Sequence, residues 1–299
     1  MMTTALLLAS AIAAAAPAAT PGETPADYTQ TIQQWRADRI VRLKAPDGWL
    51  SLVGLDWLKP GANRIGSAED NDIVLKVGPP HLGTVTLADD GSVAIALDKP
   101  GDATIDGKHV AHASLLDDSH DHPTIVAIGS TEFYLIEREG KHGLRIKNPQ
   151  APSRTGFTGI DSYPIDPSWR IVAKWVPFDP VHHVQVATRI GTLADFPVPG
   201  KAVFERDGHT YTVLPVIEVP GDTELFVMFA DRTSGKTTYG AGRFLYAAMP
   251  KDGKIVLDFN KAYNPPCAFT PYATCPLPPP ENRLGLAVTA GEKTYTHGE

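Results

Sequence analysis

The stretch from 258 to 284 limits the folds open to this chain more than any other. Seven of the 27 prolines in the 299-residue chain lie in it, between Pro265 and Pro280. Each proline ring fixes φ and removes a backbone N–H, so this stretch can form neither a helix nor a central strand. Because it also holds aromatic residues and both cysteines of the chain, disorder is not expected. We predict a rigid loop that lies over a β scaffold.

The regular elements predicted outside this loop are one helix and many short strands. Thr24 as N-cap and Pro25 at the first helical position predict a helix over 24–45. From Trp49 onward, short apolar runs alternate with clusters of Gly, Pro, Asn and Asp, which is typical of sandwiches and open barrels. The predicted fold class is therefore all-β.

The short strands fall into two groups along the chain. The first group occupies 46–147 and predicts a β-sandwich. The second occupies 154–297 and predicts a β-rich domain that carries the loop 258–284. The segment between them, NPQAPS at 148–153, has the composition of a linker, so we expect a domain boundary there.

Residues 1–18 have the shape of a signal peptide. An apolar run from Leu6 to Ala16 leads into the small-x-small pattern Ala16-Pro17-Ala18. The run is shorter than the roughly 20 apolar residues of a membrane span. We therefore expect a periplasmic or secreted protein whose mature chain starts near Ala19 and has no transmembrane segment. The net charge of -7 provides no basic face for nucleic acid.

Export determines how Cys267 and Cys275 are interpreted. In an oxidising compartment, the only two cysteines of a chain are expected to form a disulfide, with two free thiols as the alternative. Closing so short a loop would stabilise the fold by about 2.5 kcal/mol if the effect is the lost entropy of the unfolded chain.

Two further motifs suggest chemistry that their surroundings do not support. Residues 230–237 (ADRTSGKT) fit a relaxed phosphate-binding loop, but Thr238-Tyr239-Gly240 follows where the mechanism needs a helix. Residues 117–122 (DDSHDH) could supply metal ligands, yet a run of charges in a loop is more often simply solvated. We predict no bound metal and no cofactor.

The candidate binding site consists of polar and aromatic residues near the loop. Asp258 and Asn260 end a predicted strand two residues apart, which places both side chains on one face. Such residues could act as acid, base or anion clamp, or they could satisfy the backbone groups of an irregular loop. No catalytic residue can be assigned. The candidate binding residues are Asp231, Tyr239, Arg243, Asp258, Asn260, Tyr263, Asn264 and Glu281.

Several sequence blocks carry a resemblance to one family. They are DFNKAYNPPCAF at 258–269 with CPLPP at 275–279, GWLSLVGL at 48–55, and DRTSG at 231–235 with YGAGRF at 239–244. From about Trp35 to Lys293 the chain resembles domain of unknown function family 1684. Because that family is uncharacterised, the resemblance implies no catalytic assignment.

A fainter resemblance concerns the first group of strands. NRIGS at 63–67, DIVL at 72–75 and IDG at 105–107 are similar to a forkhead-associated sandwich. That family binds phosphothreonine through an Arg after the Ile-Gly and a Ser-x-x-His further on. Here Ser67 stands in place of the Arg, and Pro79-Pro80-His81 occupies the later region. The resemblance therefore implies the fold and not phosphopeptide binding.

Two functions remain open at this point. The first is a ligand- or partner-binding module of the cell envelope, which would take an unknown small molecule, glycan or peptide. Aromatic side chains beside immobile backbone suit such contacts, because little entropy is lost on binding. The alternative is a hydrolase that acts on a sugar or ester through carboxylates beside the loop 258–284. The lack of a nucleophile motif such as Gly-x-Ser-x-Gly favours the binding module.

Overall fold

The structure, a computed structural model, describes residues 24–296. The predicted signal peptide therefore lies outside the described residues. Helix α1 (Pro25–Leu43) begins where the sequence predicts, because the Thr24 hydroxyl accepts the Asp27 N–H and the Asp27 carboxylate accepts the Thr24 N–H. Within residues 24–296, no helix is both long and apolar enough to cross a membrane.

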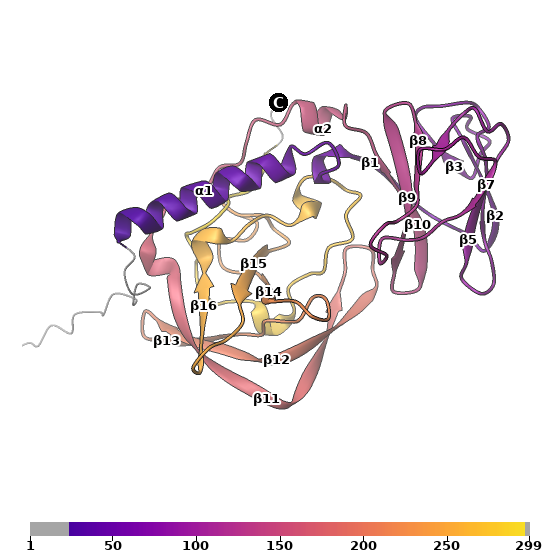
Figure 1. The fold of residues 1–299 in the computed structure, drawn as a ribbon. Helices are drawn as coiled ribbons and strands as arrows, with labels where there is room; N and C mark the ends of the chain where they lie inside the picture. Colours follow the sequence, from indigo (N-terminus) through magenta and orange to yellow (C-terminus); the bar gives the residue numbers. More distant parts are fainter. Residues whose placement is uncertain (1–23, 297–299) are drawn as a thin grey trace, which may run out of the picture.

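Helix α1 lies along one side of the second β region and leads toward the first (Figure 1). It is fixed through one face, on which Tyr28, Ile32 and Leu43 are buried. A short 3-10 turn, η1 (Trp49–Ser51), then connects it to the first strand. The buried face of α1 thus packs against the second β region.

Residues 52–147 form two five-stranded sheets at one end of the molecule (Figure 1). The first sheet has the order β1-β10-β9-β8-β6 and the second the order β3-β2-β4-β5-β7. Side chains from both sheets, such as Phe133 and Val85, share one apolar core. The bounds are β1 (Leu52–Trp57), β2 (Gly61–Gly66), β3 (Ile73–Val74), β4 (Gly83–Leu87), β5 (Val93–Leu97), β6 (Thr104–Ile105), β7 (His112–Ser114), β8 (Ile125–Ile128), β9 (Thr131–Arg138) and β10 (Lys141–Lys147).

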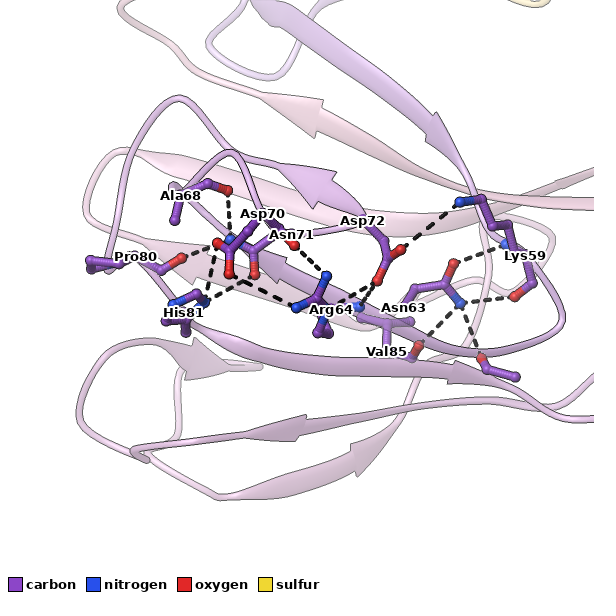
Figure 2. A network of polar contacts seen from close by, with 11 residues as sticks. Lys59, Asn63, Arg64, Ala68, Asp70, Asn71, Asp72, Pro80, His81 and Val85 are labelled. Carbon is purple, nitrogen blue, oxygen red and sulfur yellow. Dashed lines mark hydrogen bonds and ion pairs between the residues drawn. The ribbon is translucent and has the colours of Figure 1, made fainter.

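A polar network holds the segment between β2 and β4, where the forkhead-associated resemblance lies (Figure 2). The backbone N–H of Arg64 and its Nε donate to the Asp72 carboxylate at 3.0 and 3.4 Å. Asn71 donates to two backbone carbonyls at 2.7 and 2.8 Å. Ser67, at the position of the missing Arg, donates to the Gly78 carbonyl at 3.0 Å. These side chains are engaged in holding their own loops together.

The second β region contains a four-stranded antiparallel sheet in the order β13-β12-β11-β16 and a separate pair, β14–β15. Strands β11 and β12 are long, and their register shifts between Pro177 and His182. The core of this region includes Trp169, Phe229 and Phe259. The bounds are η2 (Pro167–Trp169), β11 (Arg170–Ala187), β12 (Leu193–Arg206), β13 (His209–Val213), β14 (Glu224–Phe229), β15 (Arg243–Ala248) and β16 (Lys254–Asp258).

The loop 258–284 folds as three 3-10 turns, η3 (Phe259–Lys261), η4 (Pro266–Ala268) and η5 (Pro280–Asn282). Its first part pairs with β15, since the backbones of Tyr263 and Phe244 exchange two hydrogen bonds of 2.9 Å. Its last part is held by Asn282, which donates to the Met228 carbonyl at 2.9 Å and accepts the Leu214 N–H at 2.7 Å. Side chains and short pairings thus replace the regular ladder that the prolines prevent.

The predicted all-β class with one N-terminal helix is confirmed, since the strands dominate the described residues. The expected linker leads into a single helical turn, α2 (Pro152–Thr155). The Ser153 hydroxyl donates to the Leu50 carbonyl at 2.7 Å, so this turn rests on η1. The domain boundary between 148 and 154 stays a prediction.

Candidate functional site

A cavity of about 590 Å³ opens between α1, the β14–β15 pair and the start of the loop 258–284. Segments that are distant in the sequence meet here, because the loop pairs with β15 while α1 crosses the same region. The lining residues are Trp35, Arg39, Arg42, Trp49, Glu218, Glu224, Phe226, Phe244, Tyr246, Lys261, Tyr263 and Pro266.

Aromatic rings form a continuous wall of this cavity. Phe244 and Tyr246 are two residues apart on β15 and therefore share one face of the strand. The ring of Phe226 on β14 lies with its centroid 4.7 Å from that of Phe244 and 5.1 Å from that of Tyr246. Tyr263 extends the wall toward α1, where its ring is 6.3 Å from that of Trp35. Rings packed against one another in this way are held in place before any ligand arrives.

Arg39 of α1 lies over this wall and is fixed from several sides. Its side chain is 12% exposed, and its guanidinium carbon is 4.6 Å from the ring centroid of Tyr263. Nε donates to the Glu292 carboxylate at 3.1 Å, and Nη2 donates to the Asn264 carbonyl at 2.8 Å. One edge of the guanidinium is therefore occupied, while Nη1 has no hydrogen-bond partner among residues 24–296.

Glu218 and Tyr246 form the polar side of the cavity. The Tyr246 hydroxyl donates to the Glu218 carboxylate in a short hydrogen bond. Glu218 is exposed as a residue, yet the atoms packed around its carboxyl group partly desolvate it and raise its pKa. Burial also raises the pKa of Tyr246 and of Tyr263, whose ring is nearly parallel to it at 6.3 Å. At neutral pH both tyrosines therefore offer neutral hydroxyls.

The structure brings two of the predicted site residues, Arg243 and Asp231, together in the interior. Arg243 Nη2 donates to the Asp231 carboxylate at 2.7 Å, and their side chains are 1% and 0% exposed. The guanidinium also donates to the backbone carbonyls of Val288, Ala290 and Glu292. These contacts tie the last part of the chain to β15. Neither side chain is among those that line the cavity.

Gly242, the residue before Arg243, packs tightly against the neighbouring strand and the loop. It has φ of +95°, and a Cβ at this position would lie 2.5 Å from the Phe229 carbonyl oxygen and from Pro278. The close approach that a glycine permits at position 242 is thus made by the protein's own backbone and loop. The relaxed phosphate-loop motif also lies here, and its residues form turns in which the Asp231 carboxylate accepts the Thr233 N–H at 2.6 Å.

Asp258 and Asn260 meet at the base of α1. The Asp258 carboxylate accepts the Tyr28 hydroxyl at 2.9 Å, and Asn260 Nδ2 donates to the same hydroxyl at 2.8 Å. Burial raises the pKa of Asp258, and the Tyr28 hydrogen bond works against this increase. Asn260 also donates to the Asp166 carbonyl at 2.8 Å. In this position the two predicted residues anchor the helix that carries Arg39.

The remaining predicted residues are distributed around the loop. Tyr263 lines the cavity, as described above. Asn264 is buried, and its backbone N–H donates to the Glu292 carboxylate at 2.6 Å. The Tyr239 hydroxyl donates to the Cys267 carbonyl at 2.8 Å. Glu281 is exposed in η5. Of the eight predicted residues, Tyr263 is thus the one that contributes a side chain to the cavity lining.

The predicted disulfide is not formed in the structure, where both cysteines are free thiols. The backbone N–H of Cys267 donates to Cys275 Sγ at 3.3 Å, so the two residues are linked by a hydrogen bond. The hydrogen bond with the Cys275 thiol lowers the pKa of Cys267 to about 7, and this interaction raises the pKa of Cys275.

Most of the residues that line the cavity were not predicted from the sequence, although the spacing of three of them indicates a shared helical face. Trp35, Arg39 and Arg42 are spaced by four and three residues, which places them on one face of a helix. That face carries both aromatic and cationic groups, and it lies against the loop. Glu218 and Glu224 had no such signal, because their approach to the cavity depends on how β14 and the preceding turn pack.

Comparisons with known proteins agree with the family resemblance. No curated protein matches this chain. A solution NMR structure of an uncharacterised protein from Haloarcula marismortui is 33% identical, over 47% of this chain and 79% of that one, with a TM-score of 0.41. The model of the family described as "Protein of unknown function (DUF1684)" matches residues 155–293, which include the loop 258–284 and most of the cavity lining. The chain belongs to this family.

Proposed function

We propose that this protein is an exported binding module of the cell envelope, and that it holds a ligand in the cavity between α1, β14–β15 and the loop. The observation that supports this proposal is the aromatic wall, in which Phe226, Phe244, Tyr246 and Tyr263 pack ring to ring around an open space of about 590 Å³. This volume is within the range of small-molecule sites, roughly 300–1,000 Å³. Prearranged rings bind with little loss of side-chain entropy.

Tryptophan emission tests this proposal, because Trp35 and Trp49 both line the cavity. Small organic acids, mono- and disaccharides and short peptides are titrated into the protein, and binding is confirmed by calorimetry. A ligand in the cavity should change the emission of the native protein and of Trp57→Phe, but the change should be lost in the double variant Trp35→Phe/Trp49→Phe. The proposal fails if no compound of the three classes binds, or if the double variant keeps the full response.

The alternative function, hydrolysis of a sugar or ester, is supported by two carboxylates in the same cavity. Glu218 has a raised pKa, as a general acid requires, and Glu224 lines the same space. Chromogenic glycosides and esters are the suitable probes. Turnover that disappears in Glu218→Gln but persists in the exposed control Glu281→Gln would replace the binding-module proposal with a hydrolase.

The cellular location is part of the proposal and is supported by the leader pattern in residues 1–18. The mature chain should begin near Ala19, in the periplasm or outside the cell. Intact-mass spectrometry of the native protein measures this directly. A mass that retains Met1 would contradict export.

Export would bring Cys267 and Cys275 into an oxidising compartment, where we propose that they join as a disulfide. The two thiols would lose two protons and two electrons to a thiol oxidant of that compartment. The sulfurs would have to approach each other from positions in which Cys275 Sγ accepts the Cys267 N–H. Thiol counting on denatured, unreduced native protein should find no free cysteine. Two free thiols in that sample would contradict the proposed disulfide.

A further inference from the structure

The charged groups that line the cavity differ in how deeply they are placed. Arg39 and Lys261 are partly buried, whereas Glu218, Glu224 and Arg42 are exposed. The partly buried charged residues of the lining are therefore both cations, Arg39 with Glu292 as its counter-ion, while the Glu218 carboxylate is engaged by the Tyr246 hydroxyl. A charge in a partly desolvated position interacts more strongly with a ligand than the same charge in open water.

Two rings of the lining, Tyr263 and Trp49, each have a cation close to the ring. The guanidinium carbon of Arg39 is 4.6 Å from the ring centroid of Tyr263, and that of Arg145 is 5.3 Å from the ring centroid of Trp49. Arg145 is almost fully buried, with its side chain 3% exposed. A cationic ligand that approached these two rings would meet a like charge close to each of them. The walls therefore disfavour ammonium ligands, although aromatic cages often bind them.

Arg39 also retains hydrogen-bonding capacity toward the cavity. Its Nε and Nη2 are used by Glu292 and Asn264, and these contacts hold the guanidinium in one orientation. Nη1 makes no hydrogen bond to any residue within 24–296. A fixed guanidinium with a spare N–H is a preorganised partner for a carboxylate, which forms short, charge-assisted hydrogen bonds.

We infer that the cavity selects an organic carboxylate with an apolar, ring-sized body. The inference rests on the proposed binding function and adds the chemical class of the ligand. The carboxylate lies beside the two partly buried cations, where Arg39 Nη1 and the ammonium of Lys261 bind it. The apolar body packs on the rings of Tyr246 and Tyr263, behind which Phe226 and Phe244 are buried, and Glu218 keeps its hydrogen bond with Tyr246.

Three ligands with one body and different head groups test this inference by calorimetry: 3-phenylpropionate, 3-phenylpropanamide and 3-phenylpropylamine. The carboxylate should bind at least about tenfold more tightly than the neutral amide, because it adds charge-assisted hydrogen bonds. The amine should bind most weakly. The preference should decrease when salt is raised from low to physiological concentration, since part of it is Coulombic.

Single-residue variants identify the side chains that cause the preference for the carboxylate. Lys261→Met should lower the carboxylate-to-amide ratio by about threefold or more while amide affinity stays the same, whereas Lys254→Met on the exposed end of β16 should change neither. Arg39→Lys keeps the charge and loses the planar fork, so it should weaken the carboxylate selectively. If Arg39→Lys does not fold, the comparison of Lys261→Met with Lys254→Met tests the inference.

The outcomes separate this inference from the proposed function. Equal affinity for carboxylate and amide, or a preference for the amine, overturns the inference and leaves a cavity that binds ligands. The inference also fails if none of the three ligands binds while a compound of another class gives the Trp35 and Trp49 response. If no compound of any class binds, both proposals fall.

Discussion

Two arginines of this protein, Arg243 and Arg39, have similar surroundings. They differ in whether part of the guanidinium remains available to a ligand. Arg243 is 1% exposed, and it donates to one carboxylate and three backbone carbonyls of the chain end. Arg39 is 12% exposed, and it donates to one carboxylate and one carbonyl while part of its guanidinium lines a cavity. Both also lie over an aromatic ring.

The difference shows how a structural arginine can be distinguished from a candidate site residue. When both terminal nitrogens of a buried guanidinium are used within the fold and the group lines no cavity, removing it costs stability and no ligand reaches it. When the protein fixes one edge and leaves the other facing a cavity, the same contacts act as preorganisation. Arg243 belongs to the first kind, and Arg39 has the geometry of the second.

The strongest test of this comparison breaks the interior pair. Asp231→Asn removes the negative charge beside Arg243, whose guanidinium is then buried without its counter-ion. We expect a loss of about 3–5 kcal/mol in the free energy of unfolding, the usual result of removing one partner of a buried ion pair. Urea denaturation monitored by tryptophan emission measures it.

The matched control for this change is Asp70→Asn. Asp70 also pairs with an arginine, Arg64, but these side chains are 62% and 57% exposed and 3.9 Å apart. Exposed pairs contribute about 0–1 kcal/mol, so this variant should unfold close to the native protein. If the two substitutions cost the same, the interior pair is not a buried ion pair in solution.

The two cysteines extend the comparison to reactivity. Cys275 is buried and its pKa is raised, whereas Cys267 is half-buried and its pKa is lowered to about 7 by the hydrogen bond with Cys275. In the reduced protein, alkylation of Cys267 by iodoacetamide should rise with pH to a midpoint near 7. At pH 7 about half of this thiol would be thiolate, against about 3% for an ordinary cysteine with pKa near 8.5.

Mass spectrometry of the labelled peptides measures this profile, and Cys267→Ser is the control that should abolish the early reaction. Cys275 should remain unlabelled until the protein unfolds. A midpoint near 8.5, or labelling of Cys275 first, would contradict the hydrogen-bonded arrangement of the two sulfurs.

The sequence was a good guide to the fold because its signals are local. Thr24 and Pro25 mark the start of α1, and the Gly, Pro, Asn and Asp clusters of the first group separate strands that do form. The prolines of 258–284 exclude a long strand, and the loop folds as 3-10 turns. Each of these features depends on a few neighbouring residues, so propensity and turn chemistry are sufficient to predict it.

The site was harder to predict because its parts meet only through tertiary packing. Asp258 and Arg243 look functional in a list of residues, since buried polar groups and catalytic groups are of the same types. Which carboxylate meets which arginine depends on how the end of the chain passes over β15, and sequence spacing does not contain that information. The helical face of Trp35, Arg39 and Arg42 could have been identified, but its partner, the ring of Tyr263, could not.

The mildest test concerns the anchor of the helix that carries Arg39. Tyr28→Phe removes the hydroxyl that Asp258 accepts at 2.9 Å and that Asn260 contacts at 2.8 Å, and it keeps the ring in the core. We expect a loss of about 1.5–3 kcal/mol, the usual range for a hydrogen bond to a charged group. The control is Tyr134→Phe in the sandwich, whose hydroxyl has no hydrogen bond to the described residues and whose removal should change stability by less than about 0.5 kcal/mol. Hydrogen exchange distinguishes a local effect from a global one: the amides of α1 should open more readily in Tyr28→Phe than those of β15 around Arg243. Equal acceleration of amide exchange in both regions would mean that the helix and the interior pair unfold as one unit. The surroundings of Arg39 and of Arg243 would then open together.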